Sequence, residues 1–498
     1  MQNPKALIIG SGVAGIAAAI RLAVQGFSVD VFEKNNTAGG KVSHFTKDGF
    51  DFDAGPSLFL QPENIKELFD LANELIEEYF SYRRLPVACK YFYENGREIT
   101  AFADREQFAA ELELKTGEPS AETRRYLTRA ETLYNNIGTV FLNHSLHKPR
   151  TWLNTNIIKA LTAVRFPYLF KTMDAYHKRF RSPEARQMFN RFATYNGSSP
   201  FKAPAMLSLI PHTELNEGVY YPEGGMISIT NTLYRLAVKK GVCFHFNAAV
   251  QSIICPQNKA VGIVVNNKNI PADIVVCNAD IYFAYKNLIG HSPKAKKIFR
   301  RERSSSALVF YWGIKKSFPQ LELHNIFFSK NYTAEFDHLF RVKNLYGDPT
   351  VYLNITSKEE PAKAPEGCEN WFVMINMAAD TSYDAAETIA AAKRNIIEKL
   401  NRILKTDIEP LIVTEEVLHP QLLEENTGSY MGSLYGTSSN SRRAAFLRHP
   451  NFTSYISHLY FCGGTVHPGG GIPLCLKSAM IMSDIIKRDF RKFKTTYA

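Results

Sequence analysis

The stretch Ala6-Leu-Ile-Ile-Gly10-Ser-Gly-Val-Ala-Gly15 decides the fold of this 498-residue chain. Ala6–Ile9 is apolar and predicts a short buried strand, and the Ala-rich run Val13–Ala23 predicts a helix. The glycines between them have the spacing G-x-G-x-x-G, which brings backbone amides and the positive end of a helix to an anionic pyrophosphate. The motif therefore predicts a βαβ unit that binds a dinucleotide.

Glu33 supports this prediction. Gly26 ends the helix, and Ser28–Glu33 alternates as a second strand. A carboxylate at the end of that strand accepts hydrogen bonds from a ribose diol and repels a 2′-phosphate, so the pattern disfavours NADP. The alternative is a packing turn without a ligand, but strand, helix and acid in register favour dinucleotide binding.

A second glycine cluster follows. Gly39-Gly40-Lys41 lets the backbone approach a ligand and offers a cation to a phosphate, and Gly49–Asp53 alternates as a strand that runs into the turn Gly55-Pro-Ser57. Two ordinary surface turns are the alternative interpretation. This N-terminus resembles the FAD-binding part of the amine oxidase and carotenoid desaturase superfamily, and the resemblance favours FAD over NAD.

A third glycine-rich segment lies near the C-terminus. Leu459–Cys462 predicts a strand, Gly463 to Gly471 is rich in glycine, and a final helix is predicted from about Pro473. Glycines remove side-chain bulk, and a helix N-terminus can stabilise negative charge on the pyrimidine edge of a flavin. A structural turn without a ligand is the alternative.

Nearly the whole chain resembles the bacterial-type phytoene desaturases, which are FAD-dependent carotenoid desaturases. Tyr195–Pro200, Tyr221–Met226 and Val275–Asp280 are similar to segments of that family. The family tail reads G-x-G-T-H-P-G-x-G-I-P, whereas Thr465 replaces its second glycine here, a change that can shift the local backbone. With the stretch Thr194–Pro200, this tail most resembles the 1-hydroxycarotenoid 3,4-desaturase branch.

The resemblance implies an FAD site. No metal site is expected, because the cysteines form no C-x-x-C pair and no cluster with histidines. The implied FAD-binding residues are Gly10, Gly12, Val13, Ala14, Gly15, Glu33, Lys34, Gly40, Lys41, Ser57, Leu58, Val250, Asn278, Leu434, Gly464, Gly471, Ile472 and Pro473. Desaturation then transfers a hydride from the carotenoid to flavin N5 in an apolar tunnel, after which a neighbouring proton is lost. His467 is a candidate proton acceptor, with a structural role in its turn as the alternative.

The resemblance also implies the fold class. We expect an α/β protein: an FAD-binding Rossmann-like domain of the glutathione-reductase and amine-oxidase type with an inserted mixed α+β substrate domain. The expected FAD-binding parts are 1–85, 216–290 and 431–498, with a helical, membrane-facing part at 86–215 and a substrate-domain sheet and helix at 291–430.

Periodicity predicts the remaining elements. Helices are expected from Pro62 through Ile76, over Ile227–Val238 and over about 384–404, and the pattern from about 120 to 195 is helical. The predicted strands are Val242–Phe246, Ile263–Val265, Leu308–Trp312, Val351–Ile355 and Trp371–Met377.

The net charge and the cysteines indicate which binding partners and which cellular compartment to expect. The net charge is +11, and no nucleic-acid motif accompanies it. Seven scattered cysteines argue against a disulfide framework and favour a reducing compartment. The apolar run Ala6–Ile20 is interrupted by glycines and too short to span a bilayer, so export is not expected.

A basic amphipathic stretch suggests membrane contact. Eight Lys or Arg and one acid lie between Lys148 and Arg181, interleaved with apolar residues. Such a stretch can lie in an anionic bilayer interface, and the alternative is a core-facing helix pair with a solvated basic face. For a carotenoid substrate we expect a cytoplasmic protein attached peripherally to the inner face of the cell membrane, with oxygen or a quinone as the electron acceptor.

Other functions of the same fold stay open at this point. They are a phytoene- or lycopene-forming desaturase, a carotene isomerase, a protoporphyrinogen or amine oxidase, and a non-catalytic isoprenoid carrier similar to GDI proteins. The tail lacks the acid that often follows the glycine of amine oxidases, and the glycines, Glu33 and Lys41 argue against a carrier without flavin.

Overall fold

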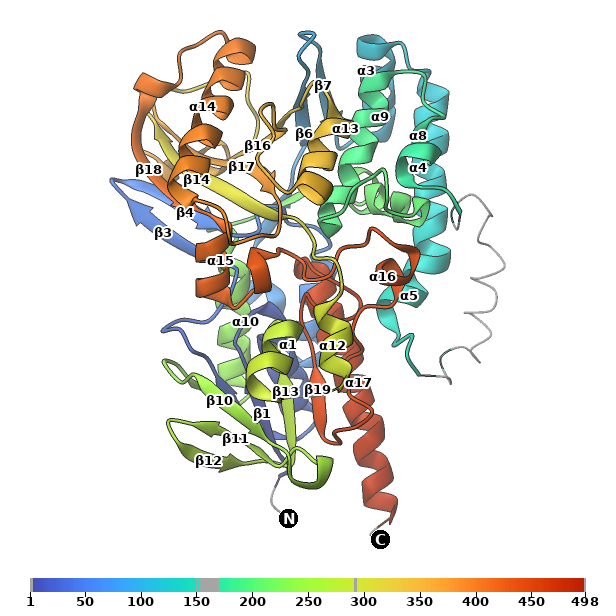
Figure 1. The fold of residues 1–498 in the computed structure, drawn as a ribbon, viewed down its shortest axis with the longest axis vertical. Helices are drawn as coiled ribbons and strands as arrows, with labels where there is room; N and C mark the ends of the chain where they lie inside the picture. Colours follow the sequence, from blue (N-terminus) through green and yellow to red (C-terminus); the bar gives the residue numbers. More distant parts are fainter. Residues whose placement is uncertain (1–2, 149–150, 152–167, 169, 291–292, 497–498) are drawn as a thin grey trace.

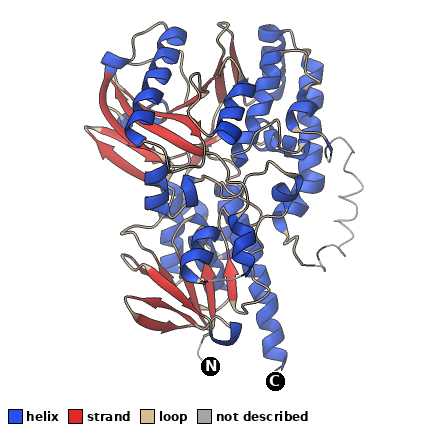
Figure 2. Cartoon of the chain, in the orientation of Figure 1, coloured by secondary structure: helices blue, strands red, loops and turns tan. Residues whose placement is uncertain are grey.

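The computed structural model describes residues 3–148, 151, 168, 170–290 and 293–496 (Figure 1). Both termini lie at one end of the long axis, beside a parallel sheet, and a larger mixed sheet with flanking helices occupies the other end (Figure 2). The chain passes between the two ends several times, because the parallel sheet takes strands from the beginning, middle and end of the sequence. The predicted domain boundaries stay a prediction.

The parallel sheet contains the predicted N-terminal and C-terminal strands in the order β19-β13-β1-β2-β9. Its strands are β1 (Lys5–Ile9), β2 (Ser28–Phe32), β9 (Cys243–His245), β13 (Ile274–Cys277) and β19 (Leu459–Phe461). All neighbours pair in parallel, with Ile9 opposite both Phe32 and Cys277. Because parallel strands end at one edge, the residues that follow them meet there.

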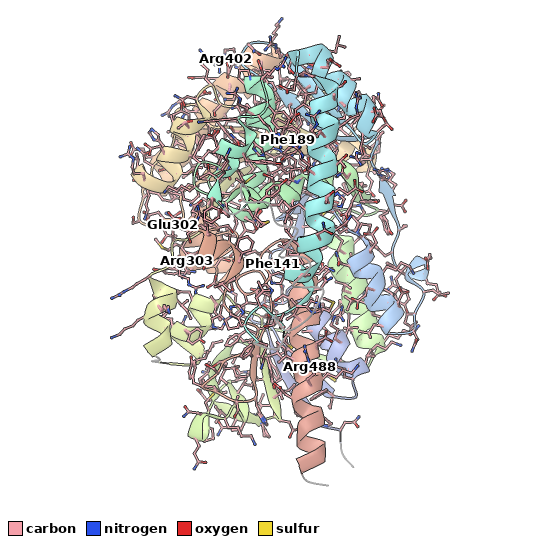
Figure 3. The ribbon with its side chains drawn as sticks, turned by 90° about the vertical axis from the view of Figure 1, so that its right-hand side faces the viewer. Phe141, Phe189, Glu302, Arg303, Arg402 and Arg488 are labelled. Carbon is pink, nitrogen blue, oxygen red and sulfur yellow. The ribbon has the colours of Figure 1, made fainter. Side chains whose placement is uncertain are left out.

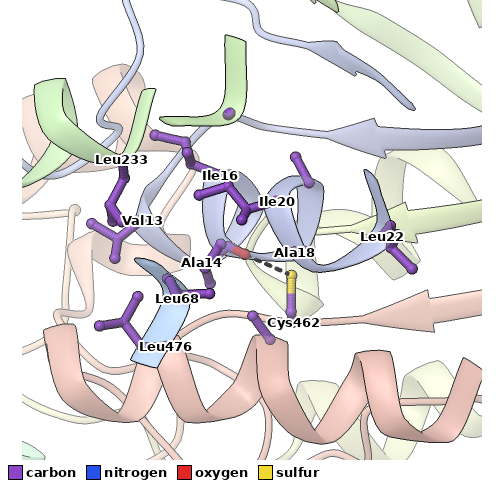
Figure 4. Packing of buried hydrophobic residues seen from close by; sticks show 14 of the residues in the cluster. Val13, Ala14, Ile16, Ala18, Ile20, Leu22, Leu68, Leu233, Cys462 and Leu476 are labelled. Carbon is purple, nitrogen blue, oxygen red and sulfur yellow. Dashed lines mark hydrogen bonds between the residues drawn. The ribbon is translucent and has the colours of Figure 1, made fainter. Parts of the chain in front are cut away.

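Alternate residues of β1 pack on opposite faces of this sheet. Ala6 and Ile8 join the core beneath four helices, whereas Leu7 and Ile9 pack toward the other face. The four helices are α1 (Val13–Val24), α2 (Glu63–Leu71), α10 (Ile227–Lys239) and α17 (Ile472–Thr496). Figure 4 shows the contact between α1 and α17, where Cys462 Sγ donates to the carbonyl oxygen of Ala14 at 3.6 Å.

The opposite face carries a small antiparallel sheet and short helices. These elements are β10 (Val250–Ile254), β11 (Gly262–Val265), β12 (Lys268–Pro271), α11 (Ile281–Phe283) and α12 (Pro293–Phe299). Ile263 and Ala295 pack with Leu7 in one buried cluster. The parallel sheet is therefore covered on both faces, as its continuous apolar strands require.

The second sheet has seven strands in the order β18-β14-β17-β16-β15-β6-β7. They are β6 (Val87–Phe92), β7 (Glu98–Phe102), β14 (Ser306–Ile314), β15 (His324–Phe327), β16 (Val351–Ile355), β17 (Glu369–Met377) and β18 (Ile412–Leu418). β15 and β6 pair in parallel, and the other neighbours pair antiparallel. α14 (Ala385–Leu404) packs on this sheet, and Asp384 caps it as an acceptor for the Glu387 amide. The predicted strands of this region and α14 are confirmed.

Helices flank the far end of the seven-stranded sheet. They are α3 (Arg105–Thr116), α4 (Ser120–Leu133), α8 (Met173–His177), α9 (Pro183–Asn190) and α13 (Tyr332–Asp337). α5 (Thr139–Asn143) lies nearer the middle of the molecule and contacts α17 (Figure 1). The remaining elements are β3 (Ser43–Lys47), β4 (Phe50–Ala54), β5 (Tyr82–Arg84), β8 (Tyr220–Pro222), α15 (Pro420–Thr427) and α16 (Arg442–Phe446).

Two local predictions were wrong. The segment 86–215 is not helical throughout, because β6 and β7 form a hairpin whose turn contains Gly96 at φ 79°. An Asn-Gly pair between apolar runs is a strong hairpin signal, and Asn95-Gly96 carries it here. Ile76 does not extend α2 either, since α2 ends at Leu71 and Ile76 begins a separate 3₁₀ turn.

No helix formed by the described residues is both long and apolar enough to cross a bilayer. Most of the basic amphipathic stretch between Lys148 and Arg181 lies outside the described residues.

Candidate functional site

The two glycine-rich ends of the chain meet at Asn278, which follows β13. Its Nδ2 donates to the carbonyl oxygen of Gly10 at 3.3 Å. On its other side, a Cβ placed on Gly463 would lie 2.7 Å from Asn278 Oδ1. Gly10 follows β1 and Gly463 comes shortly after β19, so the parallel strand order brings both segments to one edge of the sheet.

Gly15 permits the tight packing of the first turn. A Cβ at this position would lie 2.1 Å from the Gly10 carbonyl oxygen and 2.8 Å from Asn278 Nδ2. Gly10 itself has φ +92°, which favours glycine. Gly12 precedes α1, and among the described residues no side chain caps that helix. The N-terminal amides of α1 are thus left for a ligand rather than for a side chain.

Glu33 lies at the same edge and is buried. Its Oε2 accepts from the Ser11 amide at 2.8 Å and from Ser11 Oγ at 3.0 Å, and its Oε1 accepts from the Asn35 amide at 3.0 Å. These bonds fix the carboxylate beside the glycine turn. Oε2 already accepts two hydrogen bonds, whereas Oε1 accepts one and keeps a second acceptor site for a ribose hydroxyl.

Lys41 lies partly buried between the N-terminal and C-terminal segments. Its Nζ donates to the carbonyl oxygen of Leu434 at 2.8 Å. Burial lowers the pKa of Lys41, and the Asp280 carboxylate opposes that shift. Burial in turn raises the pKa of Asp280. Lys41 is therefore tied to the C-terminal half of the site, and its predicted contact with a phosphate stays a prediction.

The C-terminal cradle begins α17. Gly471 has φ +99°, and an added Cβ would meet no described atom within 4 Å, so the turn before Ile472 is open. The unusual Thr465 is accommodated, because its Oγ1 accepts from the Ile281 amide at 3.0 Å. The side chain that replaces the expected glycine thus joins the cradle to the start of α11.

His467 is buried within this cradle, and the contacts favour its structural role. Its Nε2 lies 2.9 Å from the carbonyl oxygen of His144, so that nitrogen carries a proton and donates it. Burial lowers the pKa of His467 to about 4. The proposed role as a proton acceptor gains no support from this arrangement.

One cavity of about 1100 Å³ connects these groups. Every predicted FAD-binding residue except Gly15 lines it, and so does His467. Its volume exceeds the roughly 300–1,000 Å³ of ordinary single-ligand pockets. Away from the glycines its walls are largely apolar, with Phe141, Leu142, Met206, Leu207, Ile210, Val309, Ile326, Phe372, Met374 and Phe446 among the lining residues.

The apolar part of this cavity lies between the two ends of the molecule. Phe141 belongs to α5, which packs against α17, and Figure 3 shows it near the middle of the long axis. The cavity thus begins at the glycine edge of the parallel sheet and continues beneath the seven-stranded sheet, where Val309 and Met374 come from β14 and β17.

Sequence reasoning missed several polar residues that line the same cavity. Arg191 donates to Glu214 Oε1 at 2.6 Å, and the Tyr195 hydroxyl donates to Glu214 Oε2. His324 and Tyr352 come from the adjacent strands β15 and β16. No local motif marks these residues, because the fold brings them together from separate segments. Asp280 could have been found, because it follows Asn278 at the carboxyl end of a parallel strand.

The residues present fit FAD. The uncapped N-terminus of α1 suits a pyrophosphate, Glu33 suits a ribose diol, and the open turn at Gly471 lets a planar ring system approach the backbone before α17. These features line one cavity.

Comparison with known proteins defines the class. The chain belongs to the family of flavin containing amine oxidoreductases, whose model matches residues 13–486. The fold class, the family resemblance and the flavin cofactor predicted from the sequence are thereby confirmed.

Individual relatives narrow the comparison. The chain is 49% identical over 482 residues to a 1-hydroxycarotenoid 3,4-desaturase of Flavobacterium sp. (strain P99-3), covering 97% of this chain and 99% of that protein. It is 34% identical over 496 residues to a 4,4′-diapolycopene oxygenase of Methylomonas sp, covering 98% and 99%. An oxidoreductase from Methanosarcina mazei has a similar fold, with a TM-score of 0.63 at 17% identity over 97% of this chain and 100% of that one.

Proposed function

We propose that the protein is an FAD-dependent carotenoid desaturase that introduces the 3,4 double bond into an acyclic 1-hydroxycarotenoid. The observation that carries the proposal is the single cavity that joins a dinucleotide-binding edge to a long apolar chamber. The 49% identity to a 1-hydroxycarotenoid 3,4-desaturase supports the substrate and the bond.

The reaction removes two hydrogens from adjacent carbons. Bound FAD supplies the hydride acceptor, and the neighbouring proton leaves to solvent or to a polar group of the cavity. The chain binds the polyene between apolar walls, orients it and excludes water. A charged base inside an apolar tunnel would be costly, so positioning rather than acid-base catalysis is its main contribution. Oxygen or a quinone reoxidises the flavin in this proposal.

Product analysis tests the proposal. The purified protein loaded with FAD is incubated separately with phytoene, lycopene and a 1-hydroxylated acyclic carotenoid, with a quinone present. We expect the hydroxylated compound to lose two hydrogen atoms, which mass spectrometry detects, and its absorption to shift to longer wavelength. Conversion of phytoene alone contradicts the proposed substrate, and gain of an oxygen atom favours an oxygenase like the Methylomonas relative.

We also propose that the protein attaches peripherally to the cytoplasmic face of the membrane that dissolves its substrate. The basic stretch between Lys148 and Arg181 supports this proposal by its charge and apolar content. Each basic residue near an anionic surface contributes about 1 kcal/mol.

Neutralising part of that stretch tests the attachment. We expect the double substitution Lys159→Gln and Arg165→Gln to weaken binding to anionic vesicles by about 2 kcal/mol, or roughly 30-fold, in a sedimentation assay. The control is Lys296→Gln with Lys297→Gln, which makes the same charge change on exposed residues of α12. If both double variants lose the same vesicle affinity, the effect is one of net charge alone, and the proposed attachment through the basic stretch is rejected.

A further inference from the structure

A hydrogen-bonded chain leads from the predicted flavin turn into the apolar chamber. Ser57 Oγ lies 2.9 Å from the Tyr352 hydroxyl, and that hydroxyl lies 2.8 Å from His324 Nδ1. All three residues line the cavity. Ser57 is among the residues assigned to FAD, so this polar chain starts at the flavin end of the chamber rather than at its far end.

The partners of His324 determine which ring nitrogen carries its proton. Asn354 Nδ2 donates to the Leu323 carbonyl oxygen at 3.2 Å, which fixes the orientation of that amide. The same Nδ2 lies 3.2 Å from His324 Nδ1, so Nδ1 must be the acceptor. Burial lowers the pKa of His324 to about 3, and the charge of Arg191 acts in the same direction. The ring is therefore neutral, and its proton is on Nε2.

That proton has no hydrogen-bond partner in the part of the chain that the structure describes. His324 is 2% exposed, and Nε2 makes no hydrogen bond to any residue that the structure describes. A buried N–H donor without an acceptor costs about 1–3 kcal/mol, so its presence in the wall of a ligand cavity indicates an acceptor on the ligand.

A second polar group faces the same chamber. Glu214 is 1% exposed and is held by Arg191 and Tyr195. Arg191 also donates to the Tyr91 hydroxyl at 2.8 Å. Glu214, Arg191 and His324 all line the same cavity, so both polar groups are available to one ligand. A carboxylate and an N–H donor together match a hydroxyl, which both accepts and donates.

We propose that His324 and Glu214 form the subsite for the hydroxyl group of the substrate, with His324 Nε2 donating to its oxygen and Glu214 accepting its proton. The inference rests on the proposed function and adds the residues that select the hydroxylated end. The hydroxyl-bearing carbon is two bonds from the first carbon of the 3,4 bond, so its subsite must lie close to the flavin. The position of Ser57 in the polar chain meets that requirement.

The substitution His324→Asn tests the subsite. Asparagine can keep an acceptor near the Nδ1 position for Asn354 and removes the Nε2 donor, whereas His324→Gln places an amide donor near Nε2. We compare kcat/KM for a 1-hydroxylated acyclic carotenoid with kcat/KM for the same carotenoid without the hydroxyl. His324→Asn should lower the preference for the hydroxylated compound about tenfold, and His324→Gln should restore most of it.

A binding measurement gives a readout that does not depend on turnover. Binding is measured by the quenching of tryptophan fluorescence. In His324→Asn the dissociation constant of the hydroxylated product should be roughly tenfold higher, and that of the product without the hydroxyl should be unchanged. The control is His177→Phe, a buried histidine outside the cavity whose two ring nitrogens both have partners; its preference should equal that of the unchanged protein.

The outcomes separate the two proposals. If the unchanged protein converts no hydroxylated carotenoid, the proposed function fails. If it does so and His324→Asn keeps the preference, or loses activity equally on both compounds, the subsite assignment is overturned.

Discussion

Gly15→Ala is expected to yield a protein that purifies with little or no FAD. The added methyl group would lie 2.1 Å from the Gly10 carbonyl oxygen and 2.8 Å from Asn278 Nδ2, and neither the backbone nor the bridging amide can yield without opening the turn. Alanine gains up to about 1 kcal/mol in helix propensity. Overpacking costs about 1–3 kcal/mol or more and outweighs that gain.

The effect reaches the cofactor because Asn278 holds both glycine segments. Displacing its side chain disturbs the bond to Gly10 and the contact with Gly463 together. We expect the dissociation constant of FAD, measured by flavin fluorescence, to rise about 10- to 100-fold. Gly347→Ala is the matched control, since its new methyl group would meet no described atom within 4 Å. Equal FAD affinity in the two variants would contradict the proposed packing.

Arg191→Met should give the largest loss of stability among single substitutions of the cavity wall. Arg191 and Glu214 are both buried and bonded to each other, so the substitution leaves a carboxylate buried without its counter-ion. Breaking a buried pair from one side costs about 3–5 kcal/mol. Chemical denaturation followed by tryptophan fluorescence should show a decrease of that size in the free energy of unfolding.

Two controls isolate the uncompensated charge. The double variant Arg191→Met with Glu214→Leu removes both charges and should recover most of the stability. Lys66→Ala breaks the exposed pair Lys66–Asp70 and should cost at most about 1 kcal/mol. A double variant as unstable as Arg191→Met would mean that packing of the arginine, and not its charge, stabilises this wall.

The parallel sheet and its ligand edge could be predicted from the sequence because their signals are local. The strand before Gly10, the helix after it and Glu33 at the end of the next strand follow one another within a short segment. The glycine cradle before Pro473 has its own local signal. Parallel strands end at the same edge, so the meeting of these segments at Asn278 follows from the strand topology.

The polar groups of the substrate chamber could not be predicted in this way. Arg191 and Glu214 come from two separate irregular helical segments. His324 and Tyr352 come from two paired strands that are well separated in the sequence. Each type of residue is common, and only the tertiary structure shows that they face one cavity. The hairpin of β6 and β7 differs from these groups, because Asn95-Gly96 between two apolar runs is a local signal for it.

A single-turnover experiment tests the central claim that FAD and the carotenoid share one cavity. The purified protein, loaded with FAD, is mixed without oxygen or quinone with an excess of a 1-hydroxylated acyclic carotenoid, and the products are extracted and counted by chromatography. We predict one new double bond per bound FAD and no further conversion until an acceptor is added. Absence of product from flavin-loaded protein, or continued conversion without an acceptor, would contradict direct hydride transfer within this cavity.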